Sequence, residues 1–278
     1  MEKLIALKHK LDAIKTMGTN AKKEALASMD DFEQRMVSLM LNPFVRFGVK
    51  KYKVADPLSK SVPSDQKAIE LLEKLAEKDK RIRTFQNKVN SGTAATRNFG
   101  VRMAKGEWIA FLDSDDLWKA DKLEKQLAML TKHPDARLIF TGSGFMDADG
   151  KPIAYTLHVP ERVNRSRLLR QNIISCSSVL IRKELMTEFP MPEEGGIHED
   201  FATWLRILEK IPWAYGVDEP LLVYRKARDS KSGKKGKSAK MNWETYKKVG
   251  IPLGSRIVCM LGYTFHGLWK YFMIWRRS

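Results

Sequence analysis

From residue 64 onward, hydrophobic and polar positions follow two spacings, one typical of amphipathic helices and the other of short buried strands. Residues 65–78 carry apolar side chains at helical spacing, and residues 108–112 form an apolar run bounded by glycine and acidic residues. Strands that alternate with helices predict an α/β fold with a mostly parallel sheet, which binds ligands at the carboxyl ends of its strands. The same patterns predict further helices at 93–103, 119–130 and 201–208, and further strands at 82–85, 137–141, 153–157 and 177–181.

The pattern before residue 64 differs. Leu4, Leu7, Leu11 and Ile14 share one helical face, and further helical spacing ends before Pro43. We therefore expect a small all-α module over residues 1–54, followed by a linker whose prolines and serines interrupt regular structure. The expected domains are residues 1–54, a linker at 55–63, the α/β domain at 64–225, and a basic loop with an amphipathic tail at 226–278.

Composition places the chain among globular proteins of a reducing compartment. Hydrophobic residues make up 43% of the 278 residues, enough for a real core. The two cysteines, Cys176 and Cys259, cannot build a disulfide framework or a four-thiolate zinc site. Charges interrupt the N-terminal apolar residues, and no apolar run reaches the roughly 20 residues of a membrane span. These features predict a cytoplasmic protein.

Positive charge gathers at the C-terminal end. The formal net charge is +17, and residues 225–278 hold fourteen Lys or Arg against two acids. Such an excess indicates an anionic partner. Residues 231–240 read as a basic loop rich in Gly and Ser, and residues 257–275 are mostly apolar and aromatic. We weigh two placements of this tail equally: peripheral contact with the inner face of the plasma membrane, or packing on the protein's own core.

An acidic turn follows the apolar run at 108–112. It carries Asp113, Asp115 and Asp116, and carboxylates this close repel one another unless a cation or an arginine neutralises them. Oxygen ligands suit Mg²⁺ or Mn²⁺, which can bridge to a diphosphate. On this motif alone, the alternative is equally weighted: Asp116 caps the next helix and the other two carboxylates are solvated.

Several ordered motifs carry a resemblance to a known family. Residues 90–100 match the pattern N-x-G-x-x-x-A-R-N-x-G, with Thr96 in place of the small alanine, and residues 106–116 match the strand and acidic turn that follow it. Residues 177–182, a Glu-Asp motif within 196–206, and residues 222–225 continue the series. Together these motifs resemble family 2 glycosyltransferases of the GT-A fold.

The resemblance implies an inverting, metal-dependent transfer from a nucleotide-diphosphate sugar to a polysaccharide or lipid-linked acceptor. On the donor side, it implies that Asp115 and Asp113 hold the divalent metal, Mn²⁺ or Mg²⁺, and contact the nucleotide sugar. It also assigns Arg97 and Asn90 to the nucleotide-sugar site.

On the acceptor side, the resemblance implies that Asp200 is the general base that deprotonates the acceptor hydroxyl, and that Glu199 helps to position the acceptor. His198 and Trp204 are candidate acceptor contacts. A structural or solvated histidine and a buried core tryptophan are the alternative interpretations of these two residues.

The family's first βαβ unit is not recognisable in this sequence. We find no P-x-Y-N turn, and Lys60 and Ser61 stand where the family has paired aspartates. We therefore expect a GT-A-like sheet truncated at its N-terminal half. Residues 19–26 and 42–50 resemble the helical N-terminal domain of phage-type ATP-dependent DNA ligases, without the Lys-x-Asp-Gly motif. Two alternative hypotheses follow: a catalytically impaired relic or chimera, and a nucleic-acid-binding protein acting through the helical module.

Overall fold

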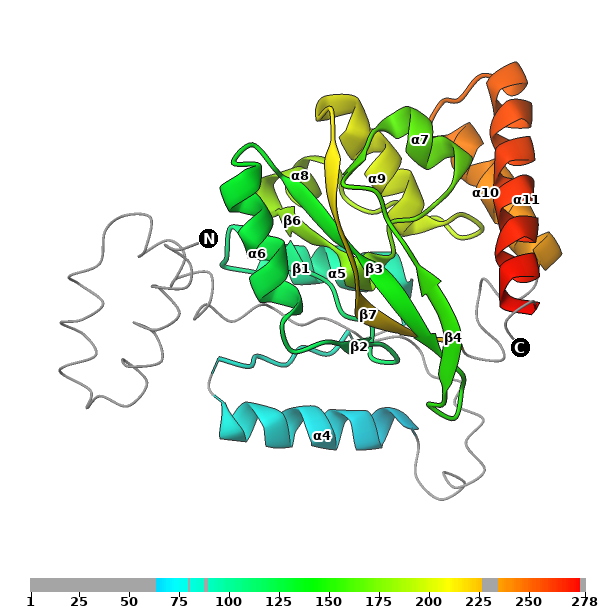
Figure 1. Cartoon of the computed structure of the whole chain (residues 1–278). Helices are drawn as coiled ribbons and strands as arrows, with labels where there is room; N and C mark the ends of the chain where they lie inside the picture. Colours follow the sequence, from blue (N-terminus) through cyan, green and yellow to red (C-terminus); the bar gives the residue numbers. More distant parts are fainter. Residues whose placement is uncertain (1–63, 80, 88–89, 227–234, 276–278) are drawn as a thin grey trace. The chain divides into compact units, whose positions relative to one another are not determined.

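The computed structural model describes residues 64–79, 81–87, 90–226 and 235–275 (Figure 1). The predictions made for the helical module, the linker and the ligase-like segments fall on residues 1–63, outside the described residues. The same holds for residues 231–234 of the predicted basic loop.

The described residues contain a seven-stranded sheet in the order β1-β6-β3-β7-β2, in which β4 also pairs with β3 and β5 with β7. Of its pairings, only β3 with β7 is parallel. The strands are β1 (Trp108–Ala110), β2 (Leu117–Trp118), β3 (Leu138–Met146), β4 (Pro152–Leu157), β5 (Arg162–Val163), β6 (Leu180–Arg182) and β7 (Ala214–Arg225).

The prediction of a mostly parallel sheet was therefore wrong, and the position of β6 explains why. β1 and β3 run in the same direction, as alternation with helices suggests, but β6 lies between them and is antiparallel to both. The alternation of strands and helices along a sequence favours one direction for successive strands. It does not show which later strand will be inserted between them.

The predicted helices are present in the described part of the chain, with ends shifted by a few residues. A predicted strand at 82–85 is absent there, and the first half of the predicted strand at 177–181 is a 3₁₀ turn, η1 (Cys176–Ser178). The latter part of the expected basic loop begins a helix. The helices are α4 (Ser64–Lys78), α5 (Gly92–Met103), α6 (Lys122–Lys132), α7 (Arg165–Arg170), α8 (Lys183–Glu188), α9 (Glu199–Lys210), α10 (Lys235–Lys248) and α11 (Leu253–Trp275).

The core lies between the sheet and α9. Phe201, Trp204, Leu205 and Leu208 recur at i, i+3, i+4 and i+7 of α9 and are all buried, so one apolar face of this helix packs inward. Burial of each such side chain contributes roughly 1.5–3 kcal/mol. Around α9, contacts link α7 and α10 to it, and α11 packs against both of those helices at the outer side (Figure 1).

A close backbone approach fixes β7 against the segment before β5. Gly216 donates its N–H to the carbonyl oxygen of Glu161 (2.9 Å). A Cβ atom at Gly216 would overlap the Pro160 carbonyl oxygen and lie 3.2 Å from both Phe140 and Val159 side chains. The contact is possible because glycine has no side chain.

We expect Gly216→Ala to lower the free energy of unfolding by about 1–3 kcal/mol, because the added methyl group forces β7 away from backbone that cannot move cheaply. Gly144→Ala is the matched control, since its Cβ would meet its nearest neighbour at 3.8 Å. Urea titration followed by circular dichroism measures both. Equal stability of the two variants would contradict the close approach.

Candidate active site

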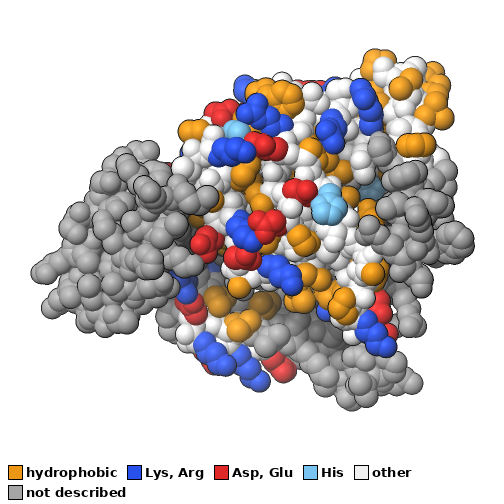
Figure 2. Space-filling view, in the orientation of Figure 1, with side chains coloured by type: hydrophobic (Ala, Val, Ile, Leu, Met, Phe, Trp, Pro, Cys, Tyr) orange, Lys and Arg blue, Asp and Glu red, His pale blue; other side chains and the backbone are white. Residues whose placement is uncertain are grey.

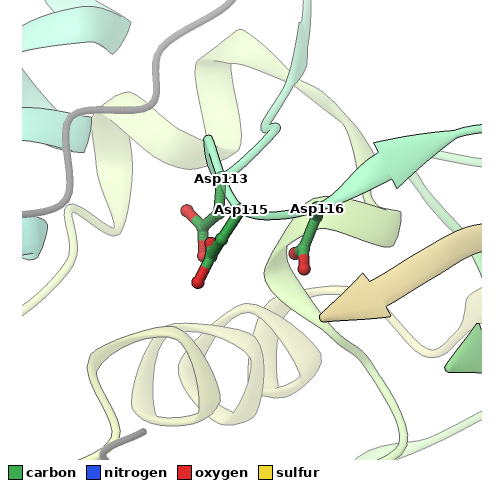
Figure 3. A group of neighbouring side chains, drawn as sticks. All are labelled: Asp113, Asp115 and Asp116. Atoms are coloured by element: carbon green, nitrogen blue, oxygen red, sulfur yellow. The ribbon is translucent and has the colours of Figure 1, made fainter. Parts of the chain in front are cut away.

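The acidic turn after β1 brings three carboxylates together. The N–H of Asp116 donates to the carbonyl oxygen of Asp113 (3.0 Å), which closes the turn. Carboxylate oxygens of Asp113, Asp115 and Asp116 lie within 4.8 Å of one another, and Figure 3 shows the three side chains pointing to the same side of the turn. The alternative role of Asp116 as a helix cap was wrong, because α6 begins at Lys122 with Asp121 as its N-cap.

Two residues from other elements hold this turn. The Ser177 hydroxyl in η1 accepts the N–H of Asp113 (3.0 Å) and hydrogen-bonds to the Asp116 carboxylate. At the end of β7, Arg225 donates its N–H to Asp116 Oδ1 (3.1 Å) and its Nε–H to the Asp115 carbonyl oxygen (3.1 Å). Both residues lie in motifs recognised in the sequence. Their spacing did not predict that either would contact the acidic turn.

The surroundings of Asp116 favour a cation at the acidic turn. Burial raises its pKa to about 6; hydrogen bonds from Ser177 and Arg225 oppose the rise, and the charges of Asp113 and Asp115 add to it. A buried carboxylate beside two others is stabilised in its charged form by a positive ion. Three convergent carboxylates supply hard oxygen ligands, so the residues present fit Mg²⁺ or Mn²⁺.

Arg97 of α5 connects the acidic turn to α9. Its guanidinium is buried and contacts both oxygens of Asp113 through Nη2 (2.7 and 2.9 Å), while Nη1 lies 3.4 Å from Glu199 Oε1. The two acidic motifs, far apart in sequence, therefore share one cation. The residues predicted for the donor side and those predicted for the acceptor side thus lie next to one another.

The charges around Arg97 hold it protonated. Burial would lower its pKa, but the neighbouring acidic groups, Cys176, Asp113 and Asp200, together raise it above the ordinary value. Burial also raises the pKa of Cys176 well above its usual range, so the thiol is neutral near pH 7 and the carboxylates supply the negative charge. Cys176 belongs to the hydrophobic core.

Glu199 and Asp200 form the first turn of α9, where the helix dipole favours negative charge. The N–H of Phe201 donates to Asp200 Oδ1 (2.8 Å). Burial raises the pKa of Asp200, and the Glu199 charge raises it further, while Arg97 and His198 oppose the rise. Asp200 is thus a carboxylate with increased basicity beside a fixed cation, which suits proton abstraction.

The remaining predicted residues lie at the margins of this centre or in the core. Asn90 is exposed and its Oδ1 accepts the Gly92 N–H (3.3 Å) at the start of α5. His198 is the N-cap of α9, and its backbone N–H donates to Thr245 Oγ1 (3.0 Å). Trp204 is fully buried in the core, which agrees with the alternative interpretation of a core tryptophan. Its ring therefore offers no surface to an acceptor.

Polar side chains of β2 and α6 support η1, which carries Ser177. The indole N–H of Trp118 donates to the Ser177 carbonyl oxygen (2.7 Å), and Gln126 donates to the Ser178 carbonyl oxygen (2.9 Å). Lys122 lies 4.1 Å above the Trp118 ring and donates to Gln126 Oε1 (2.7 Å). Burial lowers the pKa of Lys122 to about 7. These side chains fix the backbone that positions the Ser177 hydroxyl.

Comparison with known proteins identifies the fold and the chemistry. The model of the family described as Glycosyl transferase family 2 matches residues 63–186. TuaG of Bacillus subtilis, a glycosyltransferase named for teichuronic acid biosynthesis, is 39% identical over 180 residues, which cover 65% of this chain and 71% of TuaG. The chain belongs to glycosyl transferase family 2. It is a glycosyltransferase that uses a nucleotide sugar.

A further relative and a solved structure are also similar to this chain. WfaP of Escherichia coli, a UDP-Glc:α-D-GlcNAc-diphosphoundecaprenol β-1,3-glucosyltransferase, is 30% identical over 199 residues, covering 72% of this chain and 77% of WfaP. The structure of TarS residues 1–349 from S. aureus, solved with UDP-GlcNAc, superposes with a TM-score of 0.52 at 17% identity. That match covers 66% of this chain and 53% of the TarS chain, and supports the GT-A-like fold.

We expect Ser177→Ala to weaken Mn²⁺ binding about tenfold, because Asp113 and Asp116 each lose a hydrogen-bond partner that fixes the turn. Ser178→Ala is the matched control: this neighbouring buried hydroxyl donates to the Ser175 carbonyl oxygen (2.7 Å) and does not contact the turn. Electron paramagnetic resonance of Mn²⁺ measures the affinity. If both variants bind Mn²⁺ equally well, the positioning role of Ser177 is wrong.

Proposed function

We propose that this glycosyltransferase transfers a hexose, with inversion, from a UDP-sugar to a lipid-linked or polysaccharide acceptor, using a divalent cation at the acidic turn. The UDP-sugar and the lipid-linked acceptor are proposed from the stated activity of WfaP, a relative that matches 72% of this chain. The transferase is assigned to residues 64–225 and the basic tail to residues 226–278.

The observation that carries the proposal is the double contact of Arg97. It joins Asp113, on the donor side of the family pattern, to Glu199, on the acceptor side. A single buried guanidinium thereby sets the separation between the carboxylates that face the donor and those that face the acceptor. Such fixed geometry is what a displacement between two bound substrates needs.

On the donor side, Asp113, Asp115 and Asp116 would hold the cation. A divalent cation bound there would supply positive charge to the diphosphate as it leaves. Ser177 and Arg225 hold the turn in the conformation in which the three carboxylates converge. Asn90, at the start of α5, is proposed to contact the nucleotide sugar.

On the acceptor side, Asp200 accepts the proton of the acceptor hydroxyl while the hydroxyl oxygen attacks the anomeric carbon. The bond from that carbon to the diphosphate oxygen breaks as the new glycosidic bond forms, so one displacement inverts the configuration. The raised pKa of Asp200 strengthens it as a base once it is ionised. Glu199, held by Arg97, and His198 are proposed to orient the acceptor.

We expect Asp200→Asn to lower kcat by roughly 10²–10⁴-fold, because the amide cannot accept the proton. Asp115→Asn should instead raise the Mn²⁺ concentration needed for half-maximal rate. The control is Glu209→Gln on the same helix, α9. The Glu209 carboxylate pairs with Arg165 (2.6 Å), and this variant should retain wild-type turnover.

The assay measures UDP release from a panel of UDP-sugars, with a synthetic GlcNAc-diphosphate lipid as acceptor. Wild-type turnover that survives both the Asp200 and the Asp115 substitution would contradict the assignment. A folded wild-type chain without turnover on any donor would favour the impaired relic instead.

A further inference from the structure

The first half of α11 exposes a continuous row of large hydrophobic side chains. They recur at i, i+4, i+5, i+8 and i+12, so they lie on one side of the helix, and each is between 51% and 68% exposed. We call this row the α11 stripe; it comprises Leu253, Ile257, Val258, Leu261 and Phe265. Figure 2 shows hydrophobic side chains gathered at the upper right, where Figure 1 places this half of α11.

The opposite side of α11 is anchored, so its orientation is fixed. Cys259 is buried, and the Tyr263 hydroxyl shares a hydrogen bond with Ser238 of α10 (3.0 Å). Gly262 faces α7, where a Cβ atom would be in ordinary van der Waals contact with Arg170 at 3.4 Å. The stripe therefore does not take part in packing α11 on α7 and α10.

Both helices that flank α11 are basic. The six residues of α7 include three arginines and no acid, and Arg167 and Arg170 are exposed. The fourteen residues of α10 include five lysines and one glutamate. A helix that exposes hydrophobic side chains and packs on two basic helices combines the two kinds of attraction that bind a helix within an anionic membrane interface.

We propose that the α11 stripe docks on an anionic phospholipid surface, with α11 lying in the plane of the membrane interface. None of the helices in the described part of the chain combines the length and the hydropathy of a membrane span. A second copy is a poorer occupant, because a two-fold contact through the stripe would bring the basic flanks α7 and α10 towards their own copies. The proposed docking determines where the protein is located and not which reaction it catalyses. Its test therefore needs neither substrate nor turnover.

The test is co-sedimentation of the full chain with vesicles. We expect binding to vesicles of phosphatidylcholine with phosphatidylglycerol, and at least about tenfold weaker binding to phosphatidylcholine alone. The double variant Val258→Ser/Leu261→Ser should lose about tenfold in affinity for the anionic vesicles, because less apolar surface enters the lipid. Added salt should weaken binding of the wild type.

Leu75→Ser/Ile82→Ser is the matched control, since both side chains are exposed hydrophobics outside α11. It should bind anionic vesicles like the wild type, and circular dichroism should show that both double variants are folded. Absence of vesicle binding, or equal binding by the α11 variant, would overturn the proposal. So would light scattering that shows a wild-type dimer converted to a monomer by the α11 substitutions, since a second copy would then cover the stripe.

Discussion

The site depends on one buried cation, the guanidinium of Arg97. It lies between Asp113 and Glu199, and the charge of Asp200 also acts on it. An arginine is removed from water at high cost unless carboxylates pair with it, and those carboxylates repel one another without it. The positions of α5, the acidic turn and the start of α9 are therefore energetically linked, although they come from separate stretches of sequence.

The mixed sheet is what makes the acidic turn rigid. Because β6 enters between β1 and β3, the 3₁₀ turn before it lies beside the end of β1, where Ser177 reaches Asp113 and Asp116. The parallel pairing of β3 with β7 extends to Arg225, whose backbone and side chain contact the same turn. The sheet order thus supplies from two sides the hydrogen bonds that oppose carboxylate repulsion.

Local patterns in the sequence were sufficient for the features that depend on neighbouring residues. Helical spacing predicted α5, α6 and α9, and the apolar run before Asp113 predicted a buried strand. Features that depend on distant pairing were not predictable: the insertion of β6, the hydrogen bonds of Ser177, and the contact of Arg97 with Glu199. Trp204 lies at the right spacing from Asp200 to face an acceptor, but it also belongs to the apolar face of α9, and burial in the core prevails.

Under the proposed function, the acidic turn is a cation-dependent site for a nucleoside diphosphate. Calorimetric titration of the folded wild-type chain with UDP, with and without Mn²⁺ and with GDP for comparison, tests it most directly. We expect UDP binding that requires Mn²⁺, because the diphosphate would otherwise meet three carboxylates without a bridging cation. UDP binding of equal strength without Mn²⁺, or no binding of UDP in its presence, would contradict it.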